Sequence, residues 1–179
     1  KPALGLQGSG GGLGYLAGAA GGDPVYVDDV FSTFLYSGNS STQSINNGID
    51  NTEKSLVWLK SRTGAGINHT LFTTFDGSRP SIAVQSNNSS TITNQTNGFN
   101  SMNSNGFTLG NSSTHMSLNN SGATYASWNF KAQKGFFDTV TYTGNGTAGR
   151  TIAHNLGSVP GMIIIKNIDA CLLYTSPSP

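Results

Sequence analysis

Alternating polar and apolar residues predict the clearest strand of the chain at positions 124–131. Successive side chains of a strand point to opposite sides, so Ala126, Trp128 and Phe130 fall on one face, and the polar residues between them fall on the other. This pattern is typical of a half-buried strand. We expect its tryptophan side to face the core.

Two other segments, 56–59 and 162–165, are continuous apolar runs bounded by polar residues. Runs this short favour central strands covered on both faces. No segment shows helical periodicity. The Asn-rich stretch 87–105 predicts loops around short strands, and 106–110 predicts a further strand. These elements together predict an all-β fold, an antiparallel β-sandwich.

The chain resembles itself at a spacing of 106 residues. Segments 36–39 and 56–60 match 142–145 and 162–166, and between them Ile45 matches Ile152 with a slip of one. A period of this length is the size of a complete small sandwich. We therefore predict a Gly-rich flexible leader at 1–22, a first sandwich repeat at 23–133 and a truncated second repeat at 134–170. Strands near 139–142 and 162–165 would then expose apolar faces unless they dock on the first repeat.

The last nine residues, 171–179, resemble one reading frame of an adapter used to fragment DNA for sequencing libraries. We therefore interpret them as an artefact and leave them out of the fold prediction. Cys171 is the only cysteine and lies in this tail. On this interpretation the natural segment contains no thiol and no disulfide.

Charged residues make up only 9% of the chain, and its net charge is +1. A nucleic-acid groove needs a stripe of Lys and Arg among aromatic residues, and the scattered basic residues form none, so we do not expect nucleic-acid binding. No apolar run approaches the length of a membrane span. Residues 1–22 also lack the charged start and apolar stretch of a secretory signal.

Several strings in the chain resemble a known but uncharacterised family. They are DDVFSTFLYSGN, NGID, LVWLKSRTG, SNGFTLG, YASWNFKA and GFFDTVTYTGNGTAGRTIAHNLGSVPGMIIIK, between about Asp23 and Asp169. They are similar to a domain that recurs in large virion proteins of tailed phages, particularly marine ones. The resemblance implies a non-enzymatic structural module of a tail fibre, tail tip or virion surface, with repeated sandwiches like the concanavalin and laminin-G jelly rolls. Its partners would be other virion proteins or further copies of itself.

Catalytic and metal-binding patterns are weak in this sequence. Glycoside cleavage needs two carboxylates across a cleft, but the single glutamate, Glu53, lies in a polar turn. The three histidines lack the short spacings of zinc sites. Asp28, Asp29, Asp50 and Asn51 could offer oxygen ligands to calcium, but a polar strand start and a turn explain them better. We therefore assign no catalytic residue, metal site or cofactor, and we do not expect an enzyme.

An alternative function is a carbohydrate-binding, lectin-like module that attaches to host surface glycans. Trp58 and Trp128 could stack on a sugar ring, but their strand patterns favour burial in the core. Loop residues are then the better candidates for glycan contact. These candidates are Tyr36, Asn39, Asn68, His69, Arg79 and Asn145.

Overall fold

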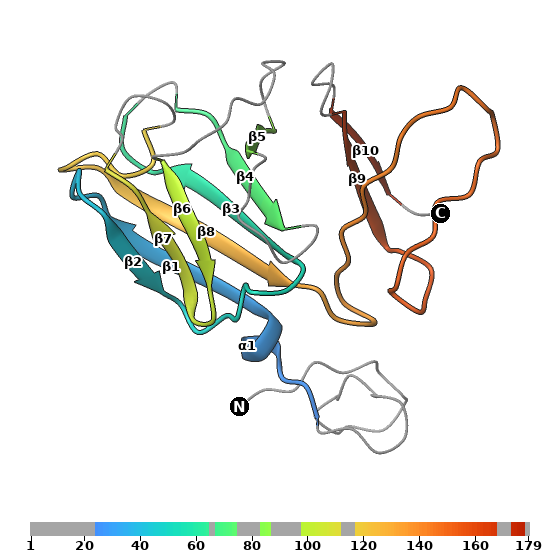
Figure 1. Cartoon of the computed structure of the whole chain (residues 1–179), viewed down its shortest axis with the longest axis horizontal. Helices are drawn as coiled ribbons and strands as arrows, with labels where there is room; N and C mark the ends of the chain where they lie inside the picture. Colours follow the sequence, from blue (N-terminus) through green and yellow to red (C-terminus); the bar gives the residue numbers. More distant parts are fainter. Residues whose placement is uncertain are drawn as a thin grey trace.

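The computed structural model describes residues 24–64, 67–74, 83–86, 98–111, 117–167 and 173–177. Within these ranges the chain forms three antiparallel sheets, and the two larger ones pack as a sandwich (Figure 1). The larger sheet has the strand order β1 (Phe31–Ser37), β8 (Thr124–Lys131), β3 (Ser55–Ser61), β4 (Thr70–Thr74) and β5 (Ala83–Gln85). The smaller sheet has the order β2 (Gln43–Asn46), β7 (Gly106–Leu109) and β6 (Phe99–Asn103). The predicted all-β antiparallel sandwich is confirmed.

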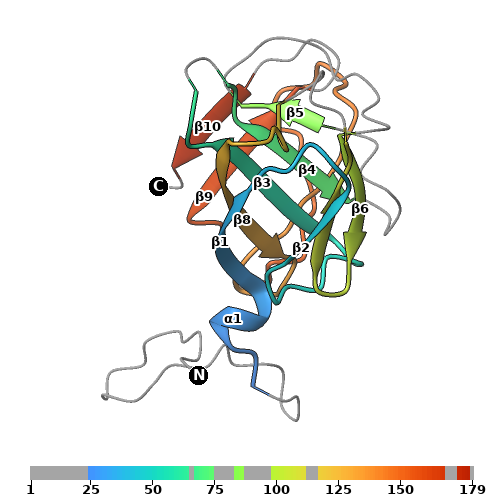
Figure 2. The same cartoon turned by 90° about the vertical axis from the view of Figure 1, so that its left-hand side faces the viewer.

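The order of pairing shows how the chain doubles back on itself. β1 pairs with β8 in the larger sheet, and β2 pairs with β7 in the smaller one, so early strands lie beside late ones. Eight-stranded jelly rolls also divide their strands between two sheets in this way. Figure 2 shows β2 and β6 in one layer and β3 and β4 in the other.

The core lies between the two sheets and is rich in aromatic rings. Tyr36 of β1 stacks on Tyr125 of β8 with ring centroids 4.9 Å apart. Phe99 of β6 stacks on Phe72 of β4 at 4.1 Å and on Phe107 of β7 at 5.4 Å, which ties the two layers together. Offset ring pairs of this kind contribute about 0.5–1.5 kcal/mol beyond the area they bury.

The sidedness predicted for β8 is wrong. The strand alternates as expected, but Tyr125, Ser127 and Asn129 are fully buried between the sheets. Trp128 and Phe130 point to the outer side of the larger sheet and are half-buried. The reason is register, because the cross-strand neighbours place β8 so that Tyr125 meets Tyr36 in the core.

β3 is a central strand, as predicted, since it lies between β8 and β4. It is not fully covered on both faces, however. Ser55, Val57 and Leu59 are fully buried, whereas Leu56 and Trp58 on the outer side are only half-buried. The predicted core burial of Trp58 is therefore wrong, as it is for Trp128, because the second sheet covers only the inner face of the larger one.

Residues 134–167 form little regular structure. The expected strand near 139–142 is not formed. β9 (Met162–Lys166) pairs with β10 (Leu173–Pro177), and among the described strands β9 has no other partner. Its apolar residues are exposed. The apolar run predicted a strand covered on both faces, and this prediction is wrong. The truncated second repeat predicted exposed apolar faces, and these are observed.

A helix that the sequence pattern did not predict, α1 (Val27–Val30), precedes β1. Its single turn is closed by the Asp29 carboxylate, which accepts a hydrogen bond from the Tyr26 backbone N–H at 2.9 Å. The predicted leader, 1–22, lies outside the described residues, and the division of the chain after Gln133 remains a prediction. Within the described part, no helix is long and apolar enough to cross a membrane.

Candidate functional site

A row of side chains lies level across four strands on the outer side of the larger sheet. Trp128 on β8 stands opposite Trp58 on β3. Thr33 on β1 extends the row beyond Trp128, and Leu71 on β4 extends it beyond Trp58. We call these four residues the tryptophan face. Both indole rings are partly accessible and Thr33 is exposed, whereas Leu71 is buried. Tryptophan with one accessible side is enriched at interfaces.

The rings of the tryptophan face are held in fixed positions. Trp58 and Trp128 pack edge to face with centroids 6.0 Å apart and an angle of 65° between their planes. Trp58 Nε1 donates a hydrogen bond to His69 Nδ1 at 2.9 Å. This bond requires an imidazole without a proton on Nδ1. Burial lowers the pKa of His69, and the nearby Lys60 ammonium lowers it further, so the acceptor form is favoured.

Polar groups lie at the edge of the tryptophan face where β3, β4 and β5 meet. Asn68 Nδ2 donates a hydrogen bond to Gln85 Oε1 at 2.9 Å. Lys60 Nζ donates to the Ile67 carbonyl oxygen. The Ser86 backbone N–H donates to the His69 carbonyl oxygen at 3.2 Å, which fixes the start of β4 against the end of β5. The site therefore combines aromatic surface with amide, imidazole and ammonium groups on a rigid sheet.

Two of the six residues predicted from sequence, Asn68 and His69, lie in this site. Tyr36 does not, because it is buried in the core and its hydroxyl donates to the Leu118 carbonyl oxygen at 2.9 Å. Asn145 lies in the exposed segment after the sandwich, where its Oδ1 accepts a hydrogen bond from the Thr147 N–H at 3.1 Å. Arg79 lies outside the described residues.

Asn39 belongs to a second polar cluster, built around a residue that sequence reasoning missed. Asn119 is buried, and its Oδ1 accepts hydrogen bonds from the Asn39 N–H at 3.0 Å and from Gln43 Nε2. Its Nδ2 donates to the Ser41 and Gly110 carbonyl oxygens. This side chain closes the loop after β1 onto the loop before β8. Nothing marks it among the many asparagines of the sequence, because its partners come from distant segments.

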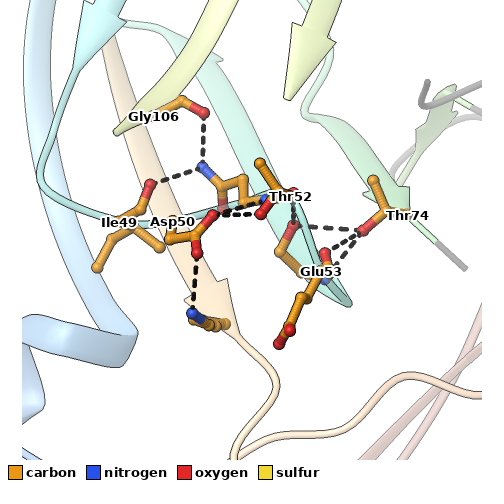
Figure 3. Close-up of polar contacts among 9 residues, drawn as sticks. Ile49, Asp50, Thr52, Glu53, Thr74 and Gly106 are labelled. Atoms are coloured by element: carbon orange, nitrogen blue, oxygen red, sulfur yellow. Dashed lines mark hydrogen bonds and ion pairs between the residues drawn. The ribbon is translucent and has the colours of Figure 1, made fainter. Parts of the chain in front are cut away.

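The loop from β2 to β3 forms a third polar cluster (Figure 3). Asp50 Oδ1 accepts hydrogen bonds from the backbone N–H and the hydroxyl of Thr52, at 3.0 and 2.6 Å. Asp50 Oδ2 lies 3.3 Å from Lys131 Nζ. The Thr52 hydroxyl is the main cause that lowers the pKa of Asp50, and Lys131 adds to it. Fully buried Asn51 donates to the Gly106 carbonyl oxygen at 2.9 Å.

This third cluster contains Asp50 and Asn51, two of the four residues considered above as calcium ligands. The Asp50 oxygens serve a turn and an ion pair, and the Asn51 amide nitrogen holds the β6–β7 hairpin, so the turn interpretation describes both residues. Calcium prefers six to eight oxygen ligands. No group of three or more His, Cys, Asp or Glu residues that could hold a metal occurs in the described ranges.

Comparison with known proteins gives one match. A family model described as a domain of unknown function, DUF7483, matches residues 27–175. The match runs across the predicted repeat boundary after Gln133 and into the tail that we interpret as an adapter, so it includes both β-sandwich sheets and β9. None of the curated proteins and none of the solved structures matches the chain.

Proposed function

Since the chain belongs to the DUF7483 family, for which no function is known, we propose its role from the structure: a non-enzymatic structural module of a phage virion protein. The parent protein would be a tail fibre, tail tip or surface protein built from repeated sandwiches.

The observation that supports the proposal is the internal repeat of the chain. β3 carries an apolar run that starts at Leu56, and β9 carries one that starts at Met162. These positions are 106 residues apart, which is the repeat spacing found in the sequence. β9 therefore stands at the position of β3 in the predicted second repeat. β10, with which β9 pairs, lies within 171–179, the tail interpreted as an artefact, so it is not a strand of that repeat.

Repetition of whole sandwiches suits a scaffold. Units that contact mainly their neighbours build long, stiff molecules whose stability accumulates along the array. The surface of this chain carries few charges and is rich in amides and hydroxyls. Such a surface makes few nonspecific electrostatic contacts, and its interactions change little with salt concentration. Both properties suit a particle that is exposed to variable salt.

The parent gene and its neighbours provide the test. We expect further copies of the 106-residue unit in the parent gene, and neighbouring genes that encode tail or capsid proteins. Mass spectrometry of purified particles should then detect peptides of this chain. A parent gene without further copies, placed far from any virion genes, would contradict the proposal.

A second candidate function, carbohydrate binding, is favoured by the tryptophan face. Aromatic faces accept the apolar faces of pyranose rings, and the amides of Asn68 and Gln85 offer hydrogen bonds beside them. This site lies on a sheet, which holds its groups more rigidly than a loop does.

Glycan binding can be tested directly with the full chain on a glycan array. If the tryptophan face is the site, Trp128→Ala should weaken binding roughly tenfold, the loss of about 1.4 kcal/mol. Tyr142→Ala is the matched control, because Tyr142 is an exposed aromatic residue outside the site. If the folded chain binds no sugar at millimolar concentration, carbohydrate binding is excluded and the scaffold role remains.

A further inference from the structure

β9 is an apolar strand that is exposed on both of its faces. The exposed fractions are 66% for Met162, 40% for Ile163, 43% for Ile164 and 39% for Ile165. Adjacent strand residues point to opposite sides, so neither face is covered. An apolar strand with a free edge is a template for pairing with another strand.

The first sandwich indicates which strand fits this edge. β3 and β9 are 106 positions apart in the repeat, and each pairs on one edge with the strand that follows it, β4 or β10. β10 lies in the tail interpreted as an artefact, so it takes the place of a β4 counterpart without belonging to the repeat. On its other edge, β3 pairs with β8. The edge of β9 that has no partner among the described strands therefore corresponds to the edge that β8 occupies on β3. At the repeat spacing, the counterpart of β8 would lie 106 positions after β8.

We propose that the free edge of β9 is an acceptor site for an antiparallel strand with the sequence character of β8. This inference rests on the proposed repeat architecture and names the contact that completes the second sandwich. In strand addition, main-chain hydrogen bonds provide affinity, and alternate side chains provide specificity.

The pairing of β8 with β3 sets the register that we expect on β9. Leu56 pairs with Phe130, Trp58 with Trp128 and Lys60 with Ala126. The counterparts of Leu56, Trp58 and Lys60 at the repeat spacing are Met162, Ile164 and Lys166, which keep two apolar positions and then a lysine.

The side-chain chemistry agrees with this register. The large rings at the Trp128 and Phe130 positions would cover Ile164 and Met162 on one face. On the other face, the small or amide side chains at the Ser127 and Asn129 positions would leave Ile163 and Ile165 free to form a core. Lys166 would stand opposite alanine, as Lys60 does, so no charge is buried against an apolar ring.

The test uses the full chain and a synthetic peptide with the sequence of residues 123–132. We expect the peptide to bind at one per chain and to slow backbone hydrogen exchange in β9 by tenfold or more, with little change in β3. A scrambled peptide of the same composition should not protect β9. No protection by the β8 peptide, or equal protection by the scrambled one, would overturn the inference.

Two variants locate the site. Ile164→Pro removes a backbone N–H from β9 and should abolish protection, and Ile164→Lys should weaken it. Val159→Lys is the matched control, since Val159 is 82% exposed and precedes the strand. Near-ultraviolet circular dichroism of each variant should match that of the parent, which shows that the first sandwich is folded.

The outcomes separate this inference from the proposed function. If the peptide binds but the parent gene lacks further repeats, the acceptor site is supported and the tandem scaffold is contradicted. If the parent gene has many repeats but the peptide does not bind, the scaffold is supported and the acceptor site is contradicted.

Discussion

The hydrogen bond from Trp58 to His69 gives a single residue control over the geometry of the tryptophan face. Because Nδ1 of His69 is the acceptor, protonation of that atom breaks the bond and places two N–H groups against each other. Burial and the Lys60 ammonium lower the pKa of His69 in the folded chain. The face is therefore held in its observed arrangement at neutral pH.

The lowered pKa of His69 predicts a pH dependence of stability. The unfolded chain takes up the proton near the ordinary histidine value of about 6.5, whereas the folded chain resists it. The free energy of unfolding should therefore fall as the pH is lowered from 7.5 to 5.5. Urea unfolding followed by tryptophan fluorescence measures this slope.

His69→Gln is the control for this prediction, because glutamine can accept the Trp58 hydrogen bond without titrating. Its slope between pH 7.5 and 5.5 should be clearly smaller than that of the parent chain. Asp50 and Asp138 do not interfere, because their lowered pKa values move their titration below this range. Identical slopes in the two proteins would rule out the role assigned to His69.

Gly106 begins β7 with a φ of +123°, in a conformation that side chains rarely adopt. A Cβ at this position would also overlap the Ile45 carbonyl oxygen on β2. Gly106→Ala should therefore destabilise the chain by more than about 2 kcal/mol. Gly122→Ala, at a φ of +80° with open space around it, should cost only about 1 kcal/mol. Urea midpoints of the two variants provide the comparison, and equal losses would contradict the steric argument.

At the scale of elements, the periodicity of the sequence predicted which segments form strands. It predicted less well which face of each strand is buried. The alternation of β8 and the central position of β3 could both be read from the sequence. Alternation alone does not say which face of a strand meets the second sheet, and here the buried face carries Ser127 and Asn129 while Trp128 points outward. That choice depends on register with β1 and β3, which local sequence does not encode.

The candidate site shows the same limit. Asn68 and His69 could be proposed from sequence as loop residues near a strand end. Their association with Trp58 depends on the β3–β4 register and on the β5 contact through Gln85, which link segments separated by loops. Sequence reasoning therefore found the polar edge of the site and assigned its aromatic centre to the core.

Asp138 is one of the contacts that attach the segment after β8 to the sandwich. Its side chain is 5% exposed and lies 3.3 Å from Lys54 Nζ, and its Oδ2 accepts a hydrogen bond from the Asn155 N–H at 2.7 Å. Burial alone would raise the pKa of Asp138, but the bonds from Asn155 and Lys54 outweigh it and lower the pKa. The carboxylate therefore links the first sandwich to residues 139–156.

Asp138→Asn should loosen this segment without unfolding the sandwich. Hydrogen exchange at the Asn155 amide should accelerate about fivefold to tenfold at neutral pH, because a bond to a charged acceptor contributes about 1 kcal/mol more than a bond to the neutral amide that replaces it. Asp50→Asn is the matched control, since it removes a comparable lysine pair within the sandwich. Equal exchange at Asn155 in both variants would show that Asp138 does not hold the segment.

At the scale of the whole molecule, apolar surface is distributed unevenly. The core between the two sandwich sheets is closed. The outer face of the larger sheet is covered around Phe130, and β9 is exposed. The cover comes from Phe136 and Phe137, whose rings lie 6.4 and 5.5 Å from that of Phe130. The segment after the sandwich therefore has a protective part near its start and an exposed part near its end.

This distribution predicts how truncation changes solubility. A chain that ends at Ser158 loses β9 but keeps the phenylalanine cover, together with the bond from the Gly135 N–H to the Leu156 carbonyl oxygen at 2.8 Å. We expect this chain to have the highest soluble concentration and the lowest fluorescence of a bound hydrophobic dye. The full chain exposes β9, and a chain that ends at Gln133 exposes Phe130, so both should bind more dye. If the chain ending at Gln133 binds least, the segment from 134 to 158 adds exposed apolar surface instead of covering it, and the protective role of Phe136 and Phe137 is wrong.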